Sequence, residues 1–365
     1  MPEKSILHNE YADWEETISV IVQSGIKSRT LLLGGADVGK TTFTRLLVNA
    51  LTATGQRVAI VDADLGQSEI GPPACVGLAF SDGQQNSLSE LSPHALMFVG
   101  STSPPGFLLE HASAIRRLAD MAGDMPLIVD TSGFLYGSGA RRRNQITFDL
   151  LAPTHVVALQ RKDELEGILA PIQRRDGVHI HRPTIPAVIG KKPSAFRTQR
   201  RAMRFAAYFE GARLHTYRFE DIAIIGAWLG CGAPLAPHLL KYLNEALGPA
   251  VKVYYGEMSD RHLSLMVSQM VHPDTPALGV AQQTLRAQGV TLTIAPRLKH
   301  LLLGLEGSNG KLLGLGLLEA IDFRRRTLGV LTPCRAPAAA CIIRIGILRV
   351  QPDGHEIGAL KPNEL

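Results

Sequence analysis

Residues 30–42 read TLLLGGADVGKTT, and this stretch decides the fold. A short apolar run, Thr30–Leu33, leads into the pattern G-x-x-x-x-G-K-[ST], which is followed by an amphipathic segment, Lys40–Ala53. A strand, a glycine-rich loop and a helix in that order form a phosphate-binding loop. Glycines let backbone N–H groups turn toward phosphate oxygens, and the helix adds the positive end of its dipole. The sequence therefore predicts a nucleoside triphosphate site at residues 34–42.

The polar residues of this loop have distinct expected tasks. We expect the Lys40 ammonium group to contact the β- and γ-phosphates of ATP, and the Thr41 hydroxyl group to bind Mg²⁺. A glycine-rich turn with an exposed lysine is the alternative, but it would not need the flanking strand and helix. The residues predicted to bind ATP are Gly34, Gly35, Ala36, Asp37, Val38, Gly39, Lys40, Thr41 and Thr42.

Short apolar runs and amphipathic stretches alternate through about residue 210. This alternation is typical of βαβ units around a parallel sheet. Strands are predicted at Thr30–Leu33, Val58–Val61, Leu96–Val99, Leu127–Val129 and Val156–Leu159. Helices are predicted at Lys40–Ala53, Leu108–Ala122, Asn144–Leu151, Glu164–Leu169 and Ser194–Phe209.

Proline and glycine become frequent after about residue 220, among runs typical of strands: Lys252–Tyr255, Thr291–Ile294, Leu328–Leu331 and Ala340–Ile347. Asn-Gly within 308–311 and Asp-Gly within 351–355 predict hairpin turns. We predict an α/β protein: a P-loop NTPase parallel sheet flanked by helices, with a smaller β-rich C-terminal domain. Its parts are a short N-terminal segment (1–27), a P-loop kinase domain (28–220) and the β-rich domain (221–365).

Composition sets the broad class. Of the 365 residues, 45% are hydrophobic and 19% are charged, which excludes a disordered chain. The net charge of +5 permits an anionic partner such as nucleic acid. The four cysteines form no C-x-x-C pair and the twelve histidines show no metal-ligand spacing. With no signal peptide and no apolar run long enough to span a bilayer, we expect a cytoplasmic protein without a membrane partner.

Acidic residues follow two predicted strands. Asp62 and Asp64 come directly after Val58–Val61, and Asp130 follows Leu127–Val129. Ligands bind at the carboxyl ends of strands in an open α/β sheet, so one carboxylate can hold the metal and another can accept a proton. The alternative is that one aspartate caps the following turn. Asp62 and Asp130 both remain candidates for the metal.

Several further motifs occur in a fixed order. They are D-A-D-L-G-Q at 62–67, G-S-T-S-P at 100–104, D-T-S-G-F at 130–134, G-S-G at 137–139, and R-T-Q-R-R-A-M-R at 197–204 followed by Tyr208-Phe209. Together with the P-loop they resemble the polynucleotide 5′-hydroxyl kinase family, which includes pre-mRNA cleavage-factor and rRNA-processing kinases and their archaeal relatives. The resemblance covers roughly residues 28–211.

The resemblance implies a reaction and roles. ATP, with Mg²⁺, would phosphorylate the 5′-hydroxyl end of RNA or DNA, with Asp64 as general base. The residues that would close over the phosphoryl group are Arg197, Arg201 and Arg204, and those that would contact the nucleic-acid end are Gln67, Thr102, Thr131 and Phe134. The chemistry agrees, because phosphoryl transfer needs charge neutralisation and the spacing puts the three arginines on one helical face.

Two residues depart from the family pattern: Phe134 replaces a tryptophan and Asp130 an asparagine. Trp14 could pack on adenine or be a plain core or surface residue, and Arg141–Arg143 could contact nucleic acid or be a solvated helix start. The alternative function is an ATP-binding scaffold or regulatory P-loop ATPase with little kinase activity. A protein partner could bind through the C-terminal domain.

Overall fold

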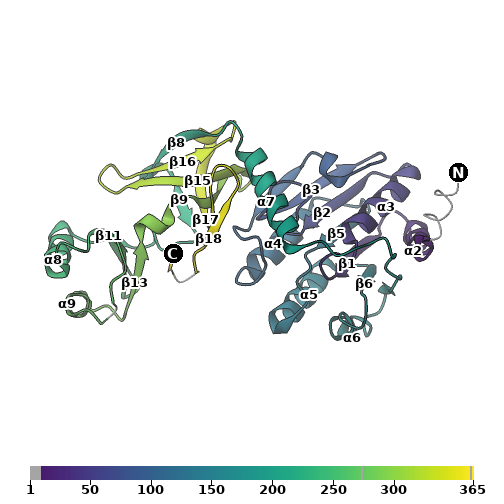
Figure 1. Ribbon diagram of the computed structural model, residues 1–365, viewed down its shortest axis with the longest axis horizontal. Helices are drawn as coiled ribbons and strands as arrows, with labels where there is room; N and C mark the ends of the chain where they lie inside the picture. Colours follow the sequence, from purple (N-terminus) through teal and green to yellow (C-terminus); the bar gives the residue numbers. More distant parts are fainter. Residues whose placement is uncertain (1–9, 273, 362–363) are drawn as a thin grey trace. The chain divides into compact units, whose positions relative to one another are not determined.

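The computed structural model describes residues 10–272, 274–361 and 364–365. The chain divides into two compact units, Met1–Arg204 and Phe205–Leu365. The division falls inside one long helix, α7 (Ser194–Phe209), which Figure 1 shows in teal. Within the described residues, no helix is both long and apolar enough to cross a membrane.

The N-terminal unit is built on one seven-stranded sheet with the order β4-β3-β2-β5-β1-β6-β7. The five strands from β2 to β7 in that order pair in parallel, whereas β3 runs antiparallel to both of its neighbours. The strands are β1 (Arg29–Gly34), β2 (Val58–Ala63), β3 (Cys75–Ser81), β4 (Ala95–Phe98), β5 (Leu127–Thr131), β6 (His155–Leu159) and β7 (His179–His181).

Helices cover both faces of this sheet (Figure 1), because alternate residues of the buried strands point to opposite sides. Leu31 and Leu33 of β1 pack with α4 (Leu108–Asp120), α5 (Gly137–Leu151) and α6 (Glu166–Ile172). Leu32, between them, packs on the other face with α2 (Ala12–Gln23) and α3 (Lys40–Ala53). This three-layer arrangement is the predicted α/β class.

Two predicted helices, α3 and α7, have the predicted bounds, whereas α4 and α6 differ from theirs by two or three residues at an end and α2 was not predicted. Strands β3 and β7 were not predicted. In β3, Gly77 interrupts the apolar pattern; a Cβ there would lie 2.1 Å from the Ile70 carbonyl oxygen, so only glycine fits this close approach. Helix α5 begins at Gly137 rather than Asn144, because its glycine-rich first turn resembles a loop in sequence.

The C-terminal unit is rich in strands, as predicted. One four-stranded sheet has the order β10-β11-β12-β13, and a second sheet has the order β18-β17-β14-β15-β16-β8 with β9 paired to β17. The elements are β8 (Arg213–Arg218), β9 (Ala223–Ile225), β10 (Ala233–Pro234), α8 (Pro237–Leu247), β11 (Val253–Ser259), β12 (His262–Val267), α9 (Pro276–Leu285), β13 (Gly289–Ile294), β14 (Leu301–Gly307), β15 (Leu312–Asp322), β16 (Thr327–Thr332), β17 (Ala340–Val350) and β18 (Glu356–Ala359).

Both predicted hairpin turns are present, between β14 and β15 and between β17 and β18. Strand β8 lies within the range 28–220 predicted for the P-loop domain, yet it pairs with β16 of the C-terminal unit. Its pairing partner is more than 100 residues away in the sequence, so local pattern does not reveal it.

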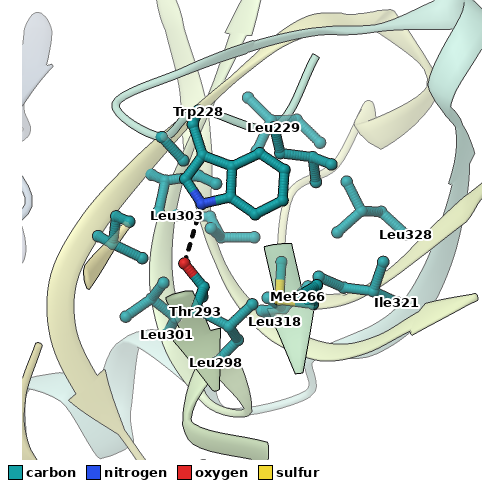
Figure 2. A pocket seen from close by; sticks show the side chains of 14 residues that line it. Trp228, Leu229, Met266, Thr293, Leu298, Leu301, Leu303, Leu318, Ile321 and Leu328 are labelled. Carbon is teal, nitrogen blue, oxygen red and sulfur yellow. Dashed lines mark hydrogen bonds between the residues drawn. The ribbon is translucent and has the colours of Figure 1, made fainter. Parts of the chain in front are cut away.

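The core of the C-terminal unit encloses a small apolar cavity, which Figure 2 shows around Trp228. The Trp228 indole nitrogen donates a hydrogen bond to Thr293 Oγ1 at 2.9 Å. The cavity volume is about 20 Å³, close to that needed for one water molecule. It is therefore a packing gap in the core and not a ligand site.

Candidate active site

The P-loop connects β1 to α3 with the backbone geometry that its sequence predicts. Gly39 has φ of 88°, in the left-handed region where glycine is favoured, and a Cβ at this position would lie 2.8 Å from the Trp14 ring. Asp37 also has a positive φ, 58°, although it carries a side chain. Lys40 is buried and its ammonium group donates to the carbonyl oxygens of Gly34 and Gly35, at 3.1 and 2.7 Å.

A second glycine that supports the P-loop lies at the end of β5. A Cβ on Gly133 would stand 2.6 Å from the Ala36 backbone nitrogen. The segment after β5 therefore packs directly against the middle of the P-loop. Any side chain at position 133 would push the two loops apart.

Asp130 contacts Thr41, the second residue of α3. The Thr41 hydroxyl donates to Asp130 Oδ2 at 2.9 Å, and Asp130 Oδ1 is buried without a hydrogen-bond partner among the described residues. Burial raises the pKa of Asp130 to about 7, while Lys40 lowers it and Asp62 raises it. One carboxylate oxygen is thus left without a protein donor beside the P-loop.

Asp62 has a different environment, although it is in register with Asp130 on the neighbouring strand. Its Oδ1 accepts the backbone N–H of Asp64, and its Oδ2 accepts the backbone N–H of Glu69 and Ile70 and the Ser68 hydroxyl. Burial raises its pKa to about 6, and the N–H of Ile70 lowers it. Asp62 organises the loop from Asp64 to Ile70, which explains why an acid stands there.

Asp64 begins that loop and lies beside the P-loop. Its Oδ1 accepts the N–H groups of Gly66 and Gln67, both at 3.0 Å. The Gln67 side-chain amide donates to the carbonyl oxygens of Gly66 and Arg197, at 2.7 and 3.1 Å. The loop after β2 therefore touches the start of α7, which is about 130 residues further along the chain.

The arginines of α7 occupy one helical face but have different partners. Arg197 pairs with Asp37 of the P-loop at 2.7 Å, and Arg200 pairs with Glu69 at 2.5 Å. Arg204 donates to the carbonyl oxygens of Glu69 and Gly71. The prediction named Arg197, Arg201 and Arg204. Arg197 and Arg200 line the pocket at the P-loop, whereas Arg201 and Arg204 are not among its lining residues.

The P-loop and the segments that contact it enclose one pocket of about 250 Å³. Its walls come from the P-loop, the loop after β2, the segment 188–192 and the first turns of α7. The lining residues are Ala36, Asp37, Gly39, Lys40, Thr41, Thr42, Asp64, Gln67, Glu69, Val188, Ile189, Gly190, Lys192, Arg197 and Arg200. The pocket thus brings together the P-loop, Asp64, Gln67 and one of the three predicted arginines.

The other predicted substrate contacts lie outside this pocket. Thr131 is buried, and its hydroxyl donates to the Leu32 carbonyl oxygen at 2.7 Å. Thr102 lies next to the loop after β2, since its carbonyl oxygen would be 3.0 Å from a Cβ on Gly66. Phe134 is partly buried near Gly139 at the start of α5. The proposed nucleic-acid contacts of these three residues stay predictions.

Arg143 differs from the prediction for the Arg141–Arg143 run. It is completely buried, and its guanidinium group donates to Ser132 Oγ, the Ser132 carbonyl oxygen and the Phe134 carbonyl oxygen. Burial lowers its pKa to about 10, and the nearby charge of Asp64 raises it. The helical period of α5 is the signal that could have found it, because Ala140, Asn144 and Thr147 on the same face are buried too.

Trp14 belongs to the core. Its side chain has no exposed surface, its indole nitrogen donates to the Thr184 carbonyl oxygen at 2.9 Å, and its ring packs edge-on against Phe43. The alternative in which it packs on adenine does not fit a side chain that is buried inside the protein.

The fold and the pocket define a class. A parallel sheet with a phosphate-binding loop after β1, an acidic turn after β2 and an arginine-bearing helix at the pocket are the features of a P-loop phosphotransferase.

Comparisons with known proteins narrow this class. Residues 34–211 match a family model described as the P-loop of mRNA cleavage and polyadenylation factor CLP1. The polyribonucleotide 5′-hydroxyl-kinase of Methanocaldococcus jannaschii is 33% identical over 353 residues, covering 94% of this chain and 93% of that protein. The enzyme of the same name from Pyrococcus horikoshii is 32% identical, covering 90% and 88%. The chain belongs to the polynucleotide 5′-hydroxyl-kinase family.

The fold itself has a solved counterpart. A structure described as the complex of wild-type Clp1p with Pcf11p aligns with a TM-score of 0.55 at 14% identity, covering 95% of this chain and 79% of that one. At this identity the likeness concerns the fold alone.

Proposed function

We propose that this protein transfers the γ-phosphoryl group of ATP to the 5′-hydroxyl end of a polynucleotide, and that RNA is its substrate. The observation that carries the proposal is the convergence of the P-loop, Asp64 and Arg197 on one pocket. The relatives named polyribonucleotide 5′-hydroxyl-kinase, which align over about nine tenths of the chain, support the choice of RNA. DNA ends are the second candidate substrate.

In the proposed reaction, the 5′-oxygen forms a bond to the γ-phosphorus as the bond to the bridging oxygen of ADP breaks. The proton of the 5′-hydroxyl passes to the Asp64 carboxylate, which reaches the pocket with one oxygen held by the N–H groups of Gly66 and Gln67. Lys40 neutralises charge on the transferring group, and Arg197 donates N–H groups to its oxygens. We add Arg200 to this set because it lines the same pocket.

Mg²⁺ would be held by Thr41 and Asp130. The buried Asp130 Oδ1 without a hydrogen-bond partner in the described chain is the feature that fits a cation there, directly or through water. Asp62 does not fit, because protein donors already occupy both of its oxygens. No group of three or more His, Cys, Asp or Glu residues in the described chain could hold a metal, so ATP phosphate oxygens would complete its ligands. The ion would neutralise phosphate charge.

The test is transfer of radiolabelled phosphate from ATP to 5′-hydroxyl oligonucleotides of RNA and DNA. We expect Lys40→Ala and Asp64→Asn to lower kcat by at least about 100-fold. Lys27→Ala and Asp124→Asn are matched controls, because both side chains are highly exposed and lie outside the pocket. If the unaltered, folded protein transfers no radiolabel to either RNA or DNA, the proposal is rejected.

The alternative is an ATP-binding scaffold or regulatory ATPase. Tight ATP binding without phosphoryl transfer to any nucleic-acid end would favour it, but Asp64 and the α7 arginines in the pocket favour the kinase. We also propose a cytoplasmic location, which the four free cysteines support. A protein partner bound through the C-terminal unit stays a prediction.

A further inference from the structure

Asp37 places an acidic side chain in the middle of the phosphate-binding loop. Its backbone φ of 58° lies in the region that favours glycine, so keeping a side chain here costs conformational energy. Its carboxylate is close to the place where ATP phosphates are expected, and like charges repel. Only 12% of the side chain is exposed. A function for this carboxylate would explain why the strain and the repulsion are tolerated.

The Asp37 carboxylate holds the segment that forms one wall of the pocket. Asp37 Oδ2 accepts a hydrogen bond from Arg197 Nη1 at 2.7 Å and another from the backbone N–H of Lys192 at 3.2 Å. The same Arg197 nitrogen also donates to the Lys192 carbonyl oxygen at 3.0 Å. One carboxylate oxygen thus fixes both the first turn of α7 and the chain that precedes it.

Two further contacts fasten this segment around the same point. Arg161, which follows β6, donates to the carbonyl oxygens of Asp37 and Ile189, at 3.1 and 2.9 Å. Gln67 donates to the carbonyl oxygen of Arg197. Residues 188–190, Lys192, Arg197 and Arg200 all line the pocket, so the fastened segment forms one of its walls. We call residues 188–200 the lid.

The pair of charges also solves the electrostatic problem that Asp37 creates. With Arg197 Nη1 at 2.7 Å, the repulsion that the Asp37 carboxylate would exert on a triphosphate is offset, while the guanidinium group keeps further N–H donors for phosphate oxygens. Without Arg197, an unpaired carboxylate would face the phosphates in a partly buried site, where charges are poorly screened.

We propose that Asp37 is a positioning residue that docks the lid on the P-loop and holds Arg197 ready for the transferring phosphoryl group. Only the positioning of Arg197 for phosphoryl transfer rests on the proposed function. The docking itself and its effect on ATP binding require no transfer to nucleic acid. The lid is thereby tied to the loop that binds the nucleotide.

The first experiment follows hydrogen exchange of lid amides in the whole protein without nucleotide. Asp37→Asn keeps the shape and removes the charge, and we expect exchange in residues 188–197 to be at least about fivefold faster, the effect of losing a coupled contact. Asp124→Asn, a highly exposed carboxylate, is the matched control and should leave lid exchange unchanged. Unchanged lid exchange in Asp37→Asn would overturn the docking role.

The second experiment is a double-mutant cycle on ATP affinity, measured by calorimetry. We expect Arg197→Ala to weaken ATP binding by about fivefold or more, because Asp37 is then unpaired, and the added Asp37→Asn change to recover much of that loss. Equal effects of Asp37→Asn with and without Arg197 would overturn the pairing. Since no nucleic acid is present, a protein that fails the labelling test can still pass both of these.

Discussion

At the scale of single residues, Arg143 is the side chain whose environment departs furthest from its sequence context. It is completely buried although the arginines at 141 and 142 directly before it are exposed, and its Nε and Nη1 atoms have no partner among the described residues. Its other terminal nitrogen holds Ser132 and Phe134. Because the Ser132–Phe134 segment packs on the P-loop through Gly133, Arg143 stabilises the segment on which the nucleotide site rests.

We expect Arg143→Met to lower the free energy of unfolding by about 1–3 kcal/mol, because it removes the donor to the Ser132 oxygens and one of the two donors to the Phe134 carbonyl oxygen. Urea unfolding measures this change. Arg142→Met is the matched control, since the neighbouring side chain is exposed, and it should change stability by less than about 0.5 kcal/mol. A more stable Arg143→Met protein would show that the buried charge costs more than its hydrogen bonds contribute.

At the scale of elements, the close contact between the end of β5 and the P-loop sets the shape of the phosphate cradle. We expect Gly133→Ala to weaken ATP binding at least about tenfold, because its Cβ would lie 2.6 Å from the Ala36 nitrogen and push the loop. Gly139→Ala, where the nearest atoms lie 3.9 Å away, is the control and should bind ATP normally. Calorimetric titration with ATP separates the two outcomes.

The edge of the sheet at β6 and β7 predicts a pH dependence. His155 and His181 contact each other through ring nitrogens at 3.0 Å, and His179 stacks on His155. Burial, and after it the charges of His181 and His179, lower the pKa of His155 to about 4. The unfolded chain therefore binds a proton near pH 6.5 while the folded protein does not, so the stability present above pH 6.5 is lost as the pH falls toward 4.

We expect His155→Gln to make the fall in the urea midpoint between about pH 7 and pH 5 shallower than in the parent protein. His272→Gln, an exposed histidine in the C-terminal unit, should keep the parent slope. Identical slopes in the His155→Gln and parent proteins would contradict the assignment of this acid sensitivity to the β6–β7 edge.

At the scale of the whole molecule, a net charge of +5 bears on substrate binding rather than on fold. We expect the KM for a 5′-hydroxyl RNA of about 20 nucleotides to rise several-fold between about 50 and 200 mM salt, because bound cations are released when phosphates are neutralised. An RNA of about three nucleotides, which has few phosphates, is the control and should change less. Equal salt effects on the two RNAs would contradict a backbone contact beyond the end.

The sequence by itself determined the nucleotide site and the α/β class. The strand, the glycine loop and the helix of residues 29–53 are neighbours in the chain, so local pattern and turn chemistry were sufficient to predict them. The order of the later motifs also identified the family. Strand β3 escaped because Gly77 interrupts its apolar pattern, and the pairing of β8 with β16 escaped because these strands are far apart in the sequence.

Only the tertiary structure decided how residues of the same type differ in their contacts and burial. Asp62 and Asp130 both lie near the ends of buried strands, but the loop after β2 supplies donors to both Asp62 oxygens, whereas Asp130 Oδ1 has no donor among the described residues. The Asp37–Arg197 pair joins residues 160 positions apart, and Arg143 is buried while Arg142 is exposed. The sequence gives the positions of the charged groups along the chain. The packing of distant segments determines which of these groups form ion pairs and which are exposed to solvent.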